Sequence, residues 1–312
     1  MKIAVAGGSG FLGRALISRL VAGGHDVVVL TRQPSTSQGR LRRVTWRPDG
    51  SVPPVEAGRP TGWAAEIDGA DAIVNLAGEG IADKRWTTTR KQALLESRTL
   101  STRSLVAAVR AASRRPPVFI QASGIGYYGT AGDETLDESS PPGSDFLAQL
   151  CLTWEAEARA IEALGARLVI IRNGVVLARQ GGALKKMLPP FLFFVGGPIA
   201  SGRQYLSWIE IDDWIALVVW AMTTAGASGV FNGTAPEPVT NAAFSAALGR
   251  AVHRPSWLPV PGFALRAMVG ELADAGLING QRVVPKRAVD LGFTFSFPGI
   301  DAALAAACRN NR

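Results

Sequence analysis

The first thirteen residues constrain the fold more than any other stretch of the chain. Residues 2–6 form a short apolar run, glycines follow at positions 7, 10 and 13, and apolar residues then recur at helical spacing. A buried strand, a glycine turn and a helix in this order are typical of a dinucleotide-binding unit. Gly7 permits the tight turn, Gly10 lets the backbone approach a pyrophosphate, and Gly13 lets the helix pack on the strand. The helix N-terminus adds N–H groups and a partial positive charge. A glycine-rich turn without a ligand is the alternative, but the strand and helix on either side favour a nucleotide.

The end of the second strand indicates which dinucleotide is bound. Residues 26–30 read Asp-Val-Val-Val-Leu and are followed by Thr31 and Arg32. NAD-binding proteins usually place an acidic residue here, on the ribose hydroxyls. An acid would repel a 2′-phosphate, whereas an arginine can pair with it through two N–H groups. Arg32 therefore predicts NADP(H), and Arg40, Arg42 and Arg43 could add positive charge; a solvated surface arginine is the alternative.

Length and composition limit the class of protein. The chain has 312 residues, of which 47% are hydrophobic, and this predicts one large α/β domain or a large domain with a smaller lobe. The two cysteines, Cys151 and Cys308, and the two histidines, His25 and His253, support neither a disulfide framework nor a metal site. No apolar run reaches the ~18 residues of a membrane span, and the first strand leaves no room for a signal peptide. We therefore expect a cytoplasmic protein without a membrane partner.

The net charge of +8 raises the question of nucleic-acid binding. The arginines are scattered, however, and no basic run carries interleaved aromatic residues. An arginine-rich proteome and a phosphate-bearing ligand explain the charge more simply. We expect no nucleic-acid partner.

Further strands are predicted at residues 41–46, 70–76, 117–121, 168–171 and 230–234, and helices at 85–109, 146–164, 214–222, 240–252 and 300–308. Asp212 or Asp213 fits the N-cap of the helix at 214–222. Because the loops at the carboxyl ends of parallel strands form the ligand crevice, Leu76 to Gly78 should face the cofactor. The complete set of expected cofactor residues is Gly7, Ser9, Gly10, Phe11, Leu12, Gly13, Thr31, Arg32, Leu76, Ala77, Gly78, Glu79, Ser97, Ala122 and Ser123.

The chain resembles the extended short-chain dehydrogenases/reductases, and more narrowly their atypical branch of epimerase family proteins. The segments that carry the resemblance span almost the whole chain: residues 7–13, 75–78, 85–86, 97–98, 123–129, 205–213, 231–236, 280–283 and 292–293. The resemblance implies an α/β fold with a doubly wound, Rossmann-type sheet of seven parallel strands. It also implies an NADP(H)-binding domain at 1–225 and a smaller C-terminal substrate-side lobe at 226–312, with part of 175–212 lining the pocket.

In the superfamily, a serine or threonine after the fifth strand hydrogen-bonds the substrate, and a Tyr and a Lys four residues apart on the next helix transfer the proton. The lysine is needed because its charge lowers the pKa of the tyrosine. Here the helix from Phe146 to Glu155 contains neither residue. Ser123 matches the serine if Tyr127 is aligned with the superfamily's Tyr-Gly motif, whereas aligning Tyr128 puts Gly124 in that place.

Two interpretations of the missing pair remain open. Tyr127 or Tyr128 could be the acid, with Glu79, Arg85 or Lys91 as support, or the protein binds NADP(H) without turnover. Tyrosines in such a loop also serve as packing residues, and Cys151 fits a core thiol better than a nucleophile because no histidine is near it in sequence. The resemblance also implies a substrate pocket, to which we assign Arg85, Arg172, Tyr205 and Trp208; Trp208 fits the core equally well.

The leading prediction is an NADP(H)-dependent epimerase/dehydratase- or reductase-like enzyme acting on a small molecule. The alternative is a catalytically inactive NADP(H)-binding protein with a regulatory or redox-sensing role. We expect a monomer or a homodimer.

Overall fold

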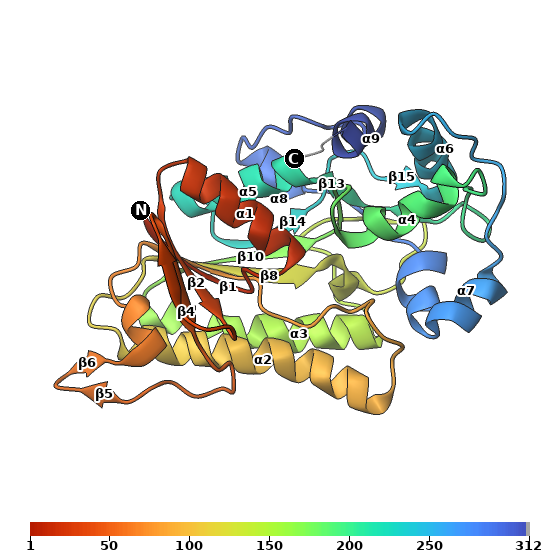
Figure 1. Ribbon diagram of the computed structural model, residues 1–312. Coiled ribbons are helices and arrows are strands. Elements are labelled where there is room, and N and C mark those ends of the chain that lie inside the picture. The colour runs from red at the N-terminus through yellow and green to blue at the C-terminus, as the bar shows by residue number, and fades with distance from the viewer. Residues whose placement is uncertain (310–312) are drawn as a thin grey trace.

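A twisted, mostly parallel sheet organises the molecule (Figure 1), and the computed structural model describes residues 1–309. Its strands, in spatial order, are β14 (Gly229–Gly233), β10 (Arg167–Asn173), β8 (Val118–Gly124), β7 (Ala72–Asn75), β1 (Lys2–Ala6), β2 (Asp26–Thr31), β4 (Leu41–Thr45) and β3 (Thr36–Gln38). Neighbouring strands pair in parallel except β3 and β4, which are antiparallel. The Rossmann-type sheet is therefore confirmed, with seven parallel strands and one short antiparallel edge strand.

Helices cover both faces of the sheet (Figure 1). One face carries α1 (Phe11–Ala22) and α5 (Ile211–Thr223), and the other carries α2 (Thr88–Ala111) and α3 (Phe146–Arg159). The central strand β1 shows why both faces are covered. Ile3 and Val5 point into one core, and Ala4 and Ala6 into the other, so the strand needs apolar residues at every position.

A separate hydrophobic core is formed largely by the C-terminal part of the chain. It is formed by α4 (Gly182–Leu192), α6 (Asn241–Ala251) and α9 (Ile300–Arg309) with the short parallel strands β11 (Val175–Leu177) and β13 (Trp208–Glu210). Helix α4 and Trp208 thus pack with the C-terminal part of the chain, while Val176 and Ile209 belong to the core of the large sheet. Since β14 belongs to the large sheet, that sheet extends past residue 225, and the division into two domains stays a prediction.

The remaining elements are short. They are the strands β5 (Val55–Glu56), β6 (Arg59–Pro60), β9 (Thr135–Leu136), β12 (Tyr205–Leu206), β15 (Val239–Thr240) and β16 (Arg282–Val283), the helices α7 (Gly262–Val269) and α8 (Lys286–Asp290), and the helical turns η1 (Gly62–Glu66), η2 (Ile125–Tyr128), η3 (Glu162–Leu164) and η4 (Asp274–Ile278). Within residues 1–309, no helix is both long and apolar enough to cross a membrane.

Several expected boundaries are corrected by the structure. The helix expected at 85–109 begins at Thr88, capped by the Thr87 hydroxyl, so Arg85 lies in the preceding loop. The helix expected at 146–164 ends at Arg159, before η3. The N-cap of α5 is neither Asp212 nor Asp213.

Glu210 caps α5, because its carboxylate accepts a hydrogen bond from the backbone N–H of Asp212 at 2.5 Å. Asp213 instead accepts hydrogen bonds from the backbone N–H groups of Ser296 and Phe297, both at 2.8 Å. Glu210 and not Asp212 caps the helix because α5 begins at Ile211, earlier than the apolar pattern indicates.

Candidate functional site

The glycine turn between β1 and α1 leaves no room for side chains. Gly7 has φ +78°, and a Cβ on it would lie 2.5 Å from the carbonyl carbon of Leu76. A Cβ on Gly13 would lie 2.4 Å from the carbonyl oxygen of Gly7. Gly10, the N-cap of α1, provides no side-chain cap. The first turn of α1 therefore presents backbone N–H groups at the carboxyl edge of the sheet, beside the loop that follows β7.

Side chains of α2 bind the loop that follows β7. The Ser97 hydroxyl accepts from the backbone N–H of Glu79 at 3.1 Å, and the Glu79 carboxylate forms an ion pair with Arg90. The buried guanidinium of Arg98 donates to the Glu79 carbonyl at 3.0 Å and lies against Gly78. The charge of Glu79, unexpected beside the phosphate site that the sequence predicts, is thus compensated by Arg90.

Arg32 is exposed at the carboxyl end of β2 and forms no ion pair with any residue among 1–309. Arg40 pairs with Asp26 at 3.0 Å and Arg42 pairs with Glu66, whereas Arg43, on β4, is exposed and also forms no ion pair within residues 1–309. Of these two unpaired arginines, Arg32 is the one that directly follows the strand that pairs with β1, and its charge is uncompensated. Both features suit a phosphate on the adenosine ribose.

The other expected cofactor residues lie around these features. Ser9 is exposed in the glycine turn. Phe11 packs its ring against Gly181 and Gly182, and Leu12 packs on the core. Thr31 is buried at the end of β2, where its hydroxyl accepts from the backbone N–H of Gln33 at 3.1 Å.

A buried polar cluster occupies the end of β8 and β10. The Ser123 hydroxyl donates to Oε1 of Glu155 at 2.7 Å, and the Arg172 guanidinium donates to both oxygens of Glu155 at 2.9 Å. Parallel pairing sets Ser123 opposite Arg172, and α3 presents Glu155 to both. Two fully paired charges are tolerated inside a protein, whereas either one alone would be strongly destabilising.

Glu155 was missed by sequence reasoning, although a signal was present. Cys151 and Glu155 are four residues apart on α3, so their side chains share one helix face. That face contacts the end of β8, where the Cys151 thiol lies 3.5 Å from the Gly124 carbonyl oxygen. Burial raises the pKa of the Cys151 thiol to about 11, which keeps it protonated near neutral pH.

The two tyrosines of η2 have different surroundings. The buried Tyr128 hydroxyl donates to Asn232 at 2.8 Å and accepts from Arg172 at 3.1 Å, and burial raises its pKa to about 12. Tyr127 is half-buried, with its ring centroid 3.2 Å from the guanidinium carbon of Arg172. Tyr128 is therefore fixed inside the cluster, while Tyr127 covers it.

The expected substrate residues are not all brought together. Arg172 lies in the cluster, and Trp208 is fully buried in the C-terminal core with its indole N–H on the Glu237 carbonyl oxygen. Tyr205 is half-buried beside the Arg282 guanidinium. Arg85 lies in the loop before α2, close to Gly270. Trp208 is thus a core residue, the alternative the sequence left open.

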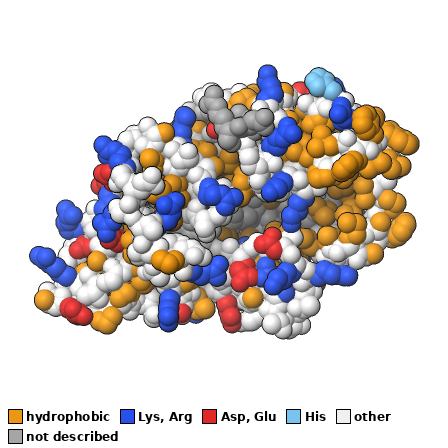
Figure 2. Space-filling model, viewed as in Figure 1, with side chains coloured by type: hydrophobic (Ala, Val, Ile, Leu, Met, Phe, Trp, Pro, Cys, Tyr) orange, Lys and Arg blue, Asp and Glu red, His pale blue; other side chains and the backbone are white. Residues whose placement is uncertain are grey.

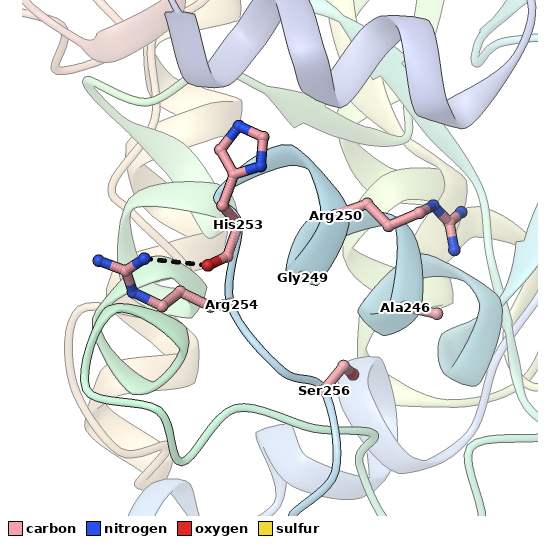
Figure 3. Close-up of a pocket in the computed structure, with 6 residues that line it drawn as sticks. All are labelled: Ala246, Gly249, Arg250, His253, Arg254 and Ser256. Carbon is pink, nitrogen blue, oxygen red and sulfur yellow. Dashed lines mark hydrogen bonds between the residues drawn. The ribbon is translucent and has the colours of Figure 1, made fainter.

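A surface pocket of about 650 Å³ lies elsewhere, at the end of α6 (Figure 3). It is lined by Ala246, Gly249, Arg250, His253, Arg254 and Ser256, and by no residue expected in the site. Among residues 1–309, no cluster of His, Cys, Asp and Glu could hold a metal ion.

Comparisons with known proteins agree with this geometry. Residues 3–232 match the NAD dependent epimerase/dehydratase family, and residues 260–307 match a domain of unknown function (DUF1731). The chloroplastic epimerase family protein SDR39U1 homolog of Arabidopsis thaliana is 41% identical over 98% of this chain and 86% of its own. Epimerase family protein YfhF of Bacillus subtilis is 39% identical over 98% of this chain and 97% of its own.

A solved structure of the human epimerase family protein SDR39U1 with NADPH covers 99% of this chain and 100% of its own, with a TM-score of 0.87 and 36% identity. The fold and the glycine turn define a nucleotide-binding α/β protein of the extended short-chain dehydrogenase/reductase type. The chain belongs to the NAD dependent epimerase/dehydratase family, and its resemblance to the epimerase family proteins is confirmed.

Proposed function

We propose that this protein is an NADP(H)-dependent enzyme of the reductase or epimerase type, acting on a small molecule beside Ser123. The observation that carries the proposal is the side-chain-free turn at Gly7–Gly13, with the unpaired Arg32 at the end of the adjacent strand. Backbone N–H groups at the start of α1 would hold the pyrophosphate, and Arg32 would hold a 2′-phosphate. The NADPH in the human relative supports this choice of cofactor.

The polar cluster gives Ser123 a defined role in binding. Its proton points at the Glu155 carboxylate, and Arg172 stabilises that carboxylate as an anion. The lone pairs of the Ser123 oxygen are then left for a donor outside the cluster. Ser123 would accept a hydrogen bond from a substrate hydroxyl or from the cofactor's carboxamide, and Glu155 and Arg172 are positioning residues.

The usual Tyr and Lys are absent from α3, which carries Cys151 and Glu155 on the face toward Ser123. Of the two candidate tyrosines, we assign proton transfer to Tyr127. The hydroxyl of Tyr128 is committed to Asn232 and Arg172, and its raised pKa makes it a poor acid near neutral pH. Bound NADP(H) would supply or accept the hydride.

One observation favours the alternative, a cofactor-binding protein without turnover. The side chains of Ser123, Glu155, Arg172 and Tyr128 already form a connected set of hydrogen bonds without any ligand. Such a cluster serves stability as well as it serves chemistry. A cytoplasmic location and a monomeric or homodimeric state stay predictions, and one relative is described as chloroplastic.

Two measurements test the proposal. Tryptophan fluorescence titration should show tighter binding of NADPH than of NADH, and a screen of carbonyl compounds should reveal loss of NADPH absorbance. Tyr127→Phe should then abolish turnover with NADPH affinity unchanged, while Tyr128→Phe should retain turnover and lower stability. Equal turnover in Tyr127→Phe and the parent would refute the assignment of Tyr127. NADPH binding with no turnover across the screen would favour the alternative function.

A further inference from the structure

An exposed apolar surface lies on the C-terminal side of the molecule, away from the glycine turn. Figure 2 shows hydrophobic side chains gathered there, over the end of α4 and over α7. Phe193 and Phe263 are 76% and 75% exposed. The members of this apolar patch are Leu192, Phe193, Phe194, Val195, Trp257, Leu258, Phe263 and Met268. Single exposed apolar residues are ordinary, but a group of this kind marks an interaction surface.

The segments that carry the apolar patch are joined to one another by hydrogen bonds. The indole N–H of Trp257 donates to the Phe194 carbonyl oxygen at 3.0 Å, and the backbone N–H groups of Trp257 and Leu258 both donate to Gly196. A β-bridge joins Ile199 to Val260, directly before α7. Every residue of α7 is exposed or half-buried.

The turn at the end of α4 is held in an unfavourable conformation. Phe194 has φ +64°, in the left-handed region that bulky residues avoid. The backbone N–H of Phe194 donates to the Phe191 carbonyl oxygen, and the Phe194 carbonyl oxygen accepts from the indole N–H of Trp257. The surrounding structure thus fixes a strained turn that leaves two phenylalanines in solvent, as is typical of functional positions.

The two segments that form the apolar patch carry charge of one sign, although Glu271 and Asp274 directly follow the second segment. These segments, 181–205 and 241–270, contain no Asp or Glu. Their basic residues are Lys185, Lys186, Arg203, Arg250, Arg254 and Arg266. Arg250 and Arg266 pair with Asp301 and Asp274, while the other four form no ion pair with residues 1–309. Arg254, on the wall of the pocket in Figure 3, stacks on Phe194 at 4.6 Å.

We propose that the apolar patch docks on an anionic lipid surface. Aromatic side chains and a short exposed helix suit the boundary between headgroups and acyl chains, and the basic residues suit acidic headgroups. A second copy of the chain is disfavoured, because a symmetric contact would bring the same positive charges face to face. Docking on the surface needs no spanning helix, and it revises the expectation that no membrane takes part. It does not depend on the proposed NADP(H) chemistry.

Vesicle co-sedimentation of the full chain tests this proposal. The protein should sediment with vesicles that contain phosphatidylglycerol, and added salt should weaken the binding. Vesicles of phosphatidylcholine alone should bind it weakly. The double variant Phe193→Ser/Phe263→Ser and the double variant Lys185→Glu/Arg203→Glu should each lower the apparent affinity by about tenfold or more.

Matched controls carry the same changes elsewhere on the surface. Val55→Ser/Val289→Ser replaces two exposed apolar residues outside the apolar patch, and Arg110→Glu/Arg159→Glu reverses two exposed charges in the last turns of α2 and α3. Both should bind as the parent does, and unchanged NADPH titrations and circular dichroism would show that the variants fold. Absence of sedimentation, or equal sedimentation of the patch variants, would overturn the proposal. So would a dimer in analytical ultracentrifugation that Phe193→Ser/Phe263→Ser dissociates while vesicle binding is absent.

Discussion

Arg172 and Glu155 form a two-point ion pair inside the protein, with Nε and Nη2 each 2.9 Å from a carboxylate oxygen. Both side chains are 3% exposed. The pair joins β10 to α3 and sets the direction of the Ser123 hydroxyl. Burial alone would lower the pKa of Arg172, but Glu155 and Tyr128 raise it above its ordinary value, so the cation is retained.

Removal of one charge from the Arg172–Glu155 ion pair should strongly lower the stability of the fold. Glu155→Gln leaves Arg172 buried without a compensating charge, and we expect the free energy of unfolding to fall by about 3–5 kcal/mol. The matched control is Glu157→Gln on the same helix, because Glu157 pairs with Arg103 at the surface; it should cost about 1 kcal/mol or less. Urea denaturation followed by circular dichroism measures both. Equal losses of unfolding free energy in the two variants would show that the buried ion pair stabilises the protein no more than the surface pair does.

Arg32 should determine the choice between the two cofactors. Arg32→Asp replaces a phosphate partner with a like charge, so NADPH affinity should fall by at least ~2 kcal/mol, or about 30-fold, with NADH little changed. Arg40→Gln, which removes a neighbouring arginine that pairs with Asp26, should have a much smaller effect. Fluorescence titration with each cofactor is the measurement. A preference for NADPH that survives Arg32→Asp would place the phosphate elsewhere.

The close approach of Gly13 to Gly7 should make position 13 intolerant of any side chain. In Gly13→Ala the new Cβ would lie 2.4 Å from the Gly7 carbonyl oxygen, and moving that backbone deforms the turn. We expect a loss of about 1–3 kcal/mol in stability together with loss of NADPH binding. Gly226→Ala, which has nothing within 4 Å, is the control and should leave both unchanged. Full NADPH affinity in Gly13→Ala would separate the turn from the cofactor site.

Glu210 should make stability fall as pH rises through neutrality. Burial raises the pKa of its carboxyl to about 7, and Oε1 has no hydrogen-bond partner in the described structure. Between its ordinary pKa of 4.5 and 7, the folded state keeps a proton that the unfolded chain has released. The free energy of unfolding therefore decreases with pH over this range, by at most about 1.4 kcal/mol per pH unit.

Glu210→Gln tests that pH dependence, because glutamine keeps an acceptor for the helix cap but does not titrate. Denaturation curves should show a flatter pH dependence in Glu210→Gln than in the parent. The exposed control Glu162→Gln should retain the parent's slope. A parental slope in Glu210→Gln would assign the effect to another group, such as Glu138, whose pKa burial also raises.

The sequence predicts correctly those elements that depend on residues close together in the chain. The strand, the glycine turn and the start of α1 follow from neighbouring residues, and most strands and helices fall within a few residues of their expected bounds. Sequence reasoning failed at Glu210 and Glu155. Whether a carboxylate caps a helix or becomes a buried partner depends on which element packs over it, and that information is not local.

The sequence by itself determined the nucleotide-binding fold, since glycine spacing and apolar runs act through steric fit and burial along one stretch of chain. The tertiary structure alone decided the polar cluster at the ends of β8 and β10. Parallel pairing of β8 with β10 brings Ser123 beside Arg172, and α3 adds Glu155, from positions up to 49 residues apart in sequence. Burial then separates the two tyrosines, because it removes water from Tyr128 and leaves Tyr127 in partial contact with solvent.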